Sequence, residues 1–149
     1  IGGGTRERGL RLLRQAGVPE PAGVEWAGQL EHGRWVDLVR RARVFLNGST
    51  WEDFGIATLE ALAAGTPLVT IPTPGSFEAL PLARELVQGL EAADVYAQAE
   101  GDALRAGLAL DDSARAEYRR GAQELLRPYR HDAVSRTVAE RVLPALGVA

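Results

Sequence analysis

The chain has 149 residues with 17 basic and 20 acidic side chains, and its formal net charge of −3 disfavours broad binding to nucleic acid or to an anionic membrane. It contains no cysteine, which excludes disulfides, thiolate catalysis and cysteine-ligated metals. No apolar stretch is long enough for a membrane span and no signal peptide is visible, so we expect one cytoplasmic domain with its own hydrophobic core.

The chain opens on a glycine-rich turn. Residues 1–4 read Ile-Gly-Gly-Gly, like the end of a buried strand, and the sequence contains no methionine, so we expect an excised fragment of a longer protein. The turn lacks the Gly-x-Gly-x-x-Gly spacing of a phosphate loop, and we interpret it as a plain connection into a helix. That helix is predicted from Leu10, Leu13 and Ala16, which share one face, and it ends at Gly17.

A short strand is predicted over residues 24–28, followed by the turn Gly28-Gln29-Leu30. Apolar residues then recur at helical spacing and predict a helix over 33–42. Its Trp35 is expected in the core rather than as a platform for ligand stacking.

The centre of the chain predicts a strand, a helix and a second strand. Residues 44–46 are wholly apolar, as in a central strand of a parallel sheet. Strong helix formers run from Ile56 to Ala64, and Gly65 is placed to end the helix. A strand over 66–71 completes a right-handed βαβ unit. Ligands of such sheets bind beyond the carboxyl ends of the strands, where the loop before Ile56 must lie.

The rest of the chain is predicted to be mainly helical, and nothing in its sequence indicates chemistry. In order, we expect a loop over 72–78, a helix over 79–90, an edge strand over 93–97 and a helix over 103–110. The next helix is capped near Asp111 and runs to Leu126, with Tyr118 and Leu125 inward. A final helix is marked by Val134, Val138 and Val142 and ends near Pro144.

Two glutamates flank the predicted start of the central helix. Glu52 belongs to the loop and Glu60 to the first turns of the helix, with seven residues between them. The first backbone amides of a helix lack internal acceptors, so Phe54, Gly55 and Ile56 are expected to hold an anion. An anion between two carboxylates fits a ligand with both phosphate and hydroxyl groups. A nucleotide sugar has both, since its diphosphate accepts hydrogen bonds from amides and its hydroxyls donate to carboxylates.

The segment from Ser49 through Pro67 resembles the Glu-x7-Glu signature of retaining GT-B glycosyltransferases, above all family 4 of the group 1 type. A Ser-x-x-Glu-x-Phe-Gly-x-x-x-x-Glu-Ala-x-Ala-x-Gly-x-Pro string is typical of that family, and this chain follows it with hardly a departure. The resemblance implies a three-layer, Rossmann-like α/β domain with a mainly parallel sheet, which is one half of a GT-B fold. Residues 1–149 would then be the nucleotide-sugar-binding C-terminal domain, whose partner is the N-terminal acceptor domain of the same parent chain.

The resemblance also implies roles for individual residues. By position, Glu52 binds the hydroxyls of the donor sugar and is the candidate catalytic residue, while Glu60 binds the ribose. The backbone of Phe54, Gly55 and Ile56 holds the distal phosphate and the sugar.

Two other segments match the family less fully. Gly28 and Leu30 stand where a Gly-x-Val/Leu turn contacts the nucleotide base through its backbone. The family usually has a Gly-Gly-x-x-Glu loop after the second strand, of which this chain keeps only Gly75 and Glu78. The role of that loop is therefore open.

The implied reaction transfers a hexose from a nucleotide-diphosphate sugar to an acceptor with retention at the anomeric carbon. The family requires no metal, and no cofactor beyond the donor is expected. Because the acceptor pocket and a basic pair lie on parts absent from this chain, we predict that the fragment binds its donor weakly and is inactive alone.

Other interpretations remain open. Taken in isolation, Glu52 would also fit a helix cap and Glu60 a solvated helix face. A non-catalytic nucleotide-binding or docking module of the same fold would need neither Glu52 nor Glu60 for chemistry. A sugar-nucleotide epimerase also shares this architecture. His32 and His131 have no acidic ligands at metal spacing and are expected at the surface. Ser49 lacks a nucleophile-elbow pattern, which disfavours a hydrolase.

Overall fold

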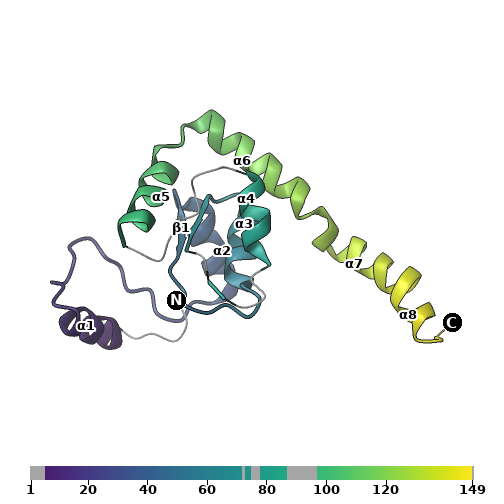
Figure 1. Cartoon of the computed structure of the whole chain (residues 1–149), viewed down its shortest axis with the longest axis horizontal. Helices are drawn as coiled ribbons and strands as arrows, with labels where there is room; N and C mark the ends of the chain where they lie inside the picture. The colour runs from purple at the N-terminus through teal and green to yellow at the C-terminus, as the bar shows by residue number, and fades with distance from the viewer. Residues whose placement is uncertain (1–5, 72, 75–77, 87–96, 149) are drawn as a thin grey trace. The chain divides into compact units, whose positions relative to one another are not determined.

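The computed structural model describes residues 6–71, 73–74, 78–86 and 97–148 (Figure 1). By its internal contacts the chain forms two compact units, Ile1–Asp37 and Leu38–Ala149. Each unit is described by itself below.

In the first unit, helix α1 spans Arg6–Gln15 and ends shortly before Gly17, as predicted. The Trp26 ring lies so close to Gly9 that a Cβ atom there would stand 2.2 Å from a ring carbon, so the packing admits only glycine. The prediction of a strand over residues 24–28 is wrong, because in the described part of the chain no neighbouring strand pairs with their backbone.

Helix α2 spans His32–Arg41, one residue earlier than predicted at each end. Trp35 is 9% exposed and Val39 is 3% exposed, so the expectation that Trp35 belongs to a core is confirmed. The Thr66 hydroxyl donates a 2.8 Å hydrogen bond to the Val39 carbonyl, which fastens the end of α2 to the segment before the second strand.

The second unit is built on two parallel strands, β1 (Phe45–Asn47) and β2 (Leu68–Thr70). Leu46 pairs with Val69 in the register. Helix α3 (Ile56–Ala64) connects the two strands, so the predicted βαβ unit is confirmed. All three β2 side chains are buried, as expected where helices cover a parallel sheet.

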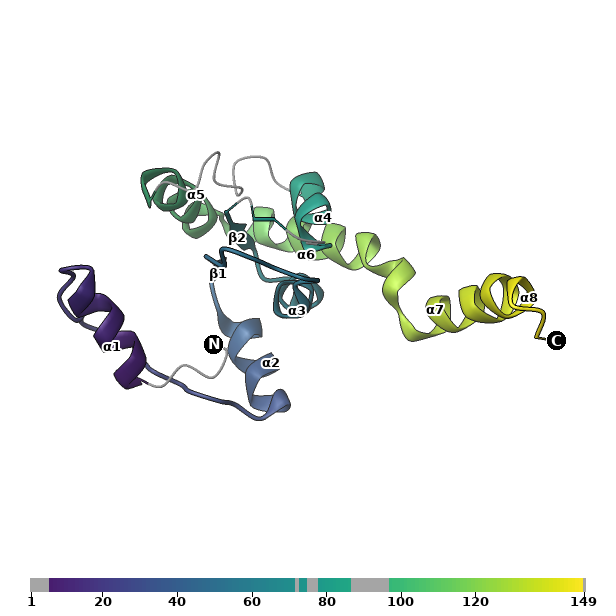
Figure 2. The same cartoon turned by 60° about the horizontal axis from the view of Figure 1, so that its bottom comes forward.

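Helices cover this sheet on both sides (Figure 2). Helix α5 (Ala97–Ala109) contacts β2, and α3 contacts both strands from the opposite side. Helices α3 and α4 (Ala79–Leu86) in turn pack against α6 (Asp112–Leu125). The predicted three-layer α/β architecture with a parallel sheet is confirmed. Helix α5 begins earlier than predicted at Ala97, and residues 93–96 of the predicted edge strand lie outside the described residues.

Helix α6 begins at a side-chain cap, because the Asp111 carboxylate accepts a 2.8 Å hydrogen bond from the Ala114 amide. Its Tyr118 is 2% exposed, and the Tyr118 hydroxyl accepts a 3.0 Å hydrogen bond from the Leu68 amide of β2. Burial raises the pKa of Tyr118 to about 12. The core around this tyrosine comprises Leu62, Leu68, Val69, Ile71, Ala79, Ala103, Tyr118 and Ala122.

The predicted final helix is interrupted. A 3₁₀ turn, η1 (Arg127–Tyr129), precedes α7 (His131–Thr137), a π-helical segment η2 (Val138–Val142) and α8 (Leu143–Ala145). The valines that predicted this helix are at least 39% exposed. None of the helices in the described ranges has both the length and the apolar character that a membrane crossing needs.

Candidate functional site at the start of helix α3

The loop that carries Glu52 begins at the carboxyl ends of both strands. Asn47 is buried there; its side-chain amide donates to the Thr70 hydroxyl at 3.4 Å, and its side-chain oxygen accepts from the Ser49 amide at 3.3 Å. Further along, the Glu52 amide donates a 3.2 Å hydrogen bond to the Pro74 carbonyl, in the segment after β2. The loop is therefore tied to the rim of the sheet where the sequence predicted it.

Helix α3 starts at a glycine rather than at a capping side chain. Gly55 has φ 76° and ψ 46°, a left-handed conformation that glycine adopts without steric cost. Its carbonyl accepts hydrogen bonds from the amides of Thr58 and Leu59 and from the Thr58 hydroxyl. Within the described ranges, the amides of Phe54, Gly55 and Ile56 donate no hydrogen bond. These three donors, without an acceptor in the described part of the chain, lie at the positive end of the helix dipole.

Carboxylates stand before and after these amides in the chain. Glu52 on the loop and Glu60 on α3 are both half-buried. Glu60 lies one turn beyond Ile56 on the same face of the helix. The exposed Asp53 between Glu52 and the helix accepts a 2.7 Å hydrogen bond from the Trp51 ring nitrogen, so its carboxylate is engaged within the loop.

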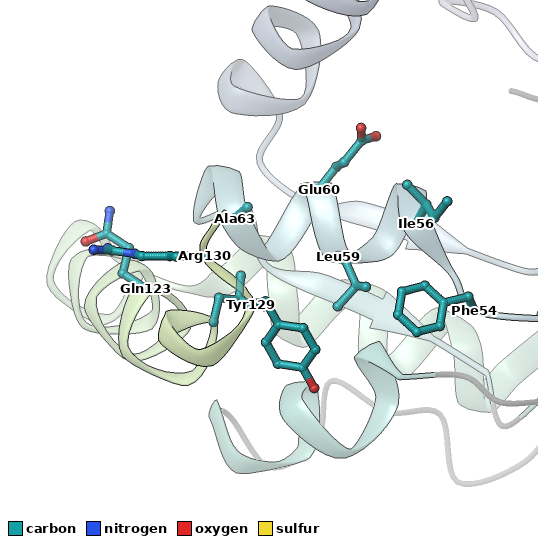
Figure 3. A pocket seen from close by; sticks show the side chains of 9 residues that line it. Phe54, Ile56, Leu59, Glu60, Ala63, Gln123, Tyr129 and Arg130 are labelled. Carbon is teal, nitrogen blue, oxygen red and sulfur yellow. The ribbon is translucent and has the colours of Figure 1, made fainter. Parts of the chain in front are cut away.

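A cavity of about 380 Å³ lies along this face of α3. Figure 3 shows the Leu59 side chain between the rings of Phe54 and Tyr129, while the Glu60 carboxylate points away from both rings. The cavity is lined by Phe54, Ile56, Leu59, Glu60, Ala63, Gln123, Leu126, Tyr129 and Arg130. The structure thus brings three of the predicted donor-binding residues, Phe54, Ile56 and Glu60, to one cavity.

The opposite wall comes from the C-terminal third of the chain, where the sequence indicated no chemistry. Pro128 cannot supply the amide that another turn of α6 would need, so the chain bends into η1 and brings Tyr129 to the cavity. The Tyr129 hydroxyl donates a hydrogen bond to the Glu78 carboxylate, which raises the pKa of Tyr129. Glu78 thereby holds this wall in place. A proline followed by an aromatic residue just after a predicted helix is the signal that would have indicated it.

The other predicted site residues lie elsewhere. Gly28 and Leu30 belong to the first compact unit, where Gly28 has φ 64° and is exposed; their contact with a nucleotide base stays a prediction. His32 and His131 are exposed, which confirms their assignment to the surface. The described residues hold no group of three or more metal-binding side chains. On the rim, the Thr73 hydroxyl is buried and has no hydrogen-bond partner in this part of the structure.

Comparison with known proteins relates this chain to one family. The family model of the glycosyl transferases group 1 matches residues 1–122. Two glycogen synthases of Mycobacterium tuberculosis, from strains CDC 1551 / Oshkosh and ATCC 25618 / H37Rv, are each 44% identical to the chain over 55 residues. The matched segment is 37% of this chain and only 13% of the length of each relative. No solved structure matches the chain.

Proposed function

The chain belongs to the glycosyl transferases group 1 family, and from this premise we propose that it is the donor-binding half of a retaining GT-B glycosyltransferase of family 4. The donor is a nucleotide-diphosphate sugar. The observation that carries this proposal is the start of α3, where the amides of Phe54, Gly55 and Ile56 have no acceptor among the described residues and lie beside two glutamates in the chain. Amides at a helix start suit phosphate oxygens, and carboxylates suit the hydroxyls of a sugar and a ribose.

Each group has its own task in this proposal. The three amides hold the distal phosphate and the hexose, Glu52 accepts hydrogen bonds from the hexose hydroxyls, and Glu60 accepts them from the ribose. The short distance in sequence between the two glutamates suits one ligand, because the ribose and the hexose are joined by only the diphosphate. The base contacts the backbone at Gly28 and Leu30.

The proposed reaction breaks the bond between the anomeric carbon and the distal phosphate oxygen. The electron pair of that bond leaves with the nucleoside diphosphate, an acceptor hydroxyl forms the new bond on the same face of the sugar, and the hydroxyl proton is released. Donors at the helix start stabilise the charge that grows on the diphosphate in the transition state. We propose that no metal is needed, that the complete enzyme is cytoplasmic, and that its N-terminal domain supplies the acceptor pocket.

The test is an NMR titration of the ¹⁵N-labelled chain with UDP, GDP, ADP and their hexose conjugates. We expect one nucleotide series to shift the amide signals of residues 54–60 and 28–30. The Glu60→Ala variant should weaken this binding about tenfold, as the loss of a buried hydrogen bond to a charged group predicts. Glu117→Ala, which removes an exposed carboxylate on α6, is the matched control and should bind as the parent does.

The outcomes separate the possible functions. Binding that is unchanged in Glu60→Ala and in Glu52→Gln would contradict the assigned roles and favour a nucleotide-binding or docking module. In the complete enzyme, Glu52→Gln should lower kcat, and EDTA should leave kcat unchanged. Inversion of the sugar's stereochemistry in the absence of acceptor would identify an epimerase instead. Robust transfer by residues 1–149 alone would refute the division into donor and acceptor halves.

A further inference from the structure

The cavity beside α3 is larger than the predicted donor contacts require. Its volume of about 380 Å³ falls in the range of small-molecule sites. The proposed donor contacts use the backbone of residues 54–56 and the carboxylate of Glu60, which points away from Leu59 and Tyr129 in Figure 3. A donor held by these groups therefore leaves the Leu59 side of the cavity open.

The open part has the composition of a carbohydrate subsite. Its floor is Leu59 and its walls include two aromatic side chains, Phe54 at 47% and Tyr129 at 41% exposure. The C–H face of a pyranose ring is apolar and packs on aromatic rings, while its hydroxyls need polar partners. The cavity lining also includes Gln123, which carries an amide, and Arg130, which carries a guanidinium.

The position of the cavity fits a reaction partner of the donor. Phe54 and Ile56 line it with their side chains, and their backbone amides are the groups proposed to hold the distal phosphate and hexose. A sugar in the cavity would thus lie next to the bond that the proposed reaction breaks. The hydrogen bond from Tyr129 to Glu78 fixes the far wall before any ligand arrives, which lowers the entropy lost on binding.

We propose that this cavity binds a neutral sugar ring of the acceptor, so that the acceptor is a saccharide and this domain contributes to its recognition. The assignment of the sugar as acceptor rests on the proposed function, whereas the binding of saccharide in the cavity is tested separately. Tyr129 and Leu59 are binding residues in this proposal, and neither takes part in the chemistry.

The experiment titrates the ¹⁵N-labelled chain with maltotriose, cellotriose and mannotriose, with and without the preferred nucleotide. At least one saccharide should shift the amide signals of residues 59–63 and 126–130. Tyr129→Ala should raise the Kd for that saccharide about tenfold, the size expected for the loss of an aromatic contact. Tyr129→Phe keeps the ring but loses the hydrogen bond to Glu78 that fixes the wall, so its Kd should rise, but by less than that of Tyr129→Ala.

Two further variants distinguish a loss of saccharide binding in the cavity from a general loss of folding. Ala63→Phe fills the cavity from an exposed helix position and should abolish saccharide binding while the rest of the spectrum is unchanged. Trp51→Ala removes an exposed aromatic residue outside the cavity and should keep saccharide binding. Neither Tyr129→Ala nor Ala63→Phe should change the Kd for the nucleotide.

The two proposals fail in different ways. Nucleotide binding without binding of any of the three saccharides would overturn the inference and leave the proposed function intact. Loss of nucleotide affinity in Tyr129→Ala would assign the cavity to the base and likewise overturn it. Saccharide binding at the cavity without any nucleotide binding would overturn the acceptor assignment together with the proposed function.

Discussion

The buried hydroxyl of Tyr118 offers a sharp test of how the sheet and α6 are joined. It accepts the hydrogen bond of the Leu68 amide at 3.0 Å, and both residues are at most 2% exposed. Tyr118→Phe removes the acceptor but keeps the ring, so the packing of the core is preserved. The Leu68 amide is then buried without a partner, and we expect the free energy of unfolding at pH 7 to fall by about 1–3 kcal/mol.

The pH dependence gives a second, independent measure of the same hydroxyl. The pKa of Tyr118 is about 12 in the folded chain, chiefly because burial disfavours the phenolate, against 10.0 for an unperturbed tyrosine. Below pH 10 the Tyr118 hydroxyl keeps its proton in both the folded and the unfolded chain, so its ionisation does not lower the free energy of unfolding. Between pH 10 and 12 the unfolded chain loses the proton first, which favours unfolding. An increase of about two in the pKa corresponds to about 2.7 kcal/mol in total, most of which is lost by pH 12 and the rest above it.

Urea unfolding followed by far-UV circular dichroism, at pH 7 and at intervals between pH 9 and 12, measures both effects. We expect the parent to be more stable than Tyr118→Phe at pH 7 and the difference to shrink or reverse by pH 12. Tyr129→Phe is the comparison for burial, because the Tyr129 hydroxyl is near the surface and the pKa of Tyr129 is raised chiefly by its hydrogen bond to Glu78. A difference between parent and Tyr118→Phe that stays constant over the whole pH range would refute the role of burial, and equal stability at pH 7 would refute the role of the hydrogen bond.

Three glycine and capping positions give further predictions. Gly55→Ala places a side chain at φ 76°, so it should lower the free energy of unfolding in urea by about 1–2 kcal/mol and weaken nucleotide binding in the NMR titration. Asp111→Ala removes the cap of α6 and should lower the free energy of unfolding by about 0.5–2 kcal/mol without changing nucleotide binding. Gly65→Ala places a side chain at φ 72°, and its Cβ would stand 2.4 Å from the Arg119 Cγ. It should lower the free energy of unfolding by at least about 1 kcal/mol. The double variant with Arg119→Ala should recover part of that loss. Parental stability in either glycine variant, or an altered nucleotide Kd in Asp111→Ala, would contradict these assignments.

The central βαβ unit was predictable because its signals are local. Helix α3 begins at Ile56 and ends at Ala64 as predicted, since both of its flanking glycines take up left-handed conformations that stop a helix from extending. The cap of α6 at Asp111 was predictable for the same reason. These features depend on a few adjacent residues and on no distant contact.

The errors arose where distant residues decide the outcome. Residues 24–28 have the pattern of a strand, but a strand forms only where a second strand pairs with its backbone. Pro128 and Tyr129 mark a bend after α6, but the residues that this bend meets across the cavity depend on the packing of α3 against α6, which is a contact between distant parts of the sequence. Glu78 likewise meets its partner, the Tyr129 hydroxyl, 51 positions further along the sequence.

The starts of α6 and α3 differ in a way that bears on the proposed function. At α6, the Asp111 carboxylate satisfies the Ala114 amide, as most helices in stable proteins arrange. At α3, Gly55 offers no side chain, and the amides of residues 54–56 donate no hydrogen bond within the described structure. A capping side chain typically contributes about 0.5–2 kcal/mol, and the glycine at the start of α3 forgoes that stability. Free amides at a helix start suit a bound anion, and the half-buried Glu52 and Glu60 on either side suit hydroxyl groups, so this helix start fits the proposed ligand, which combines phosphate with hydroxyl groups.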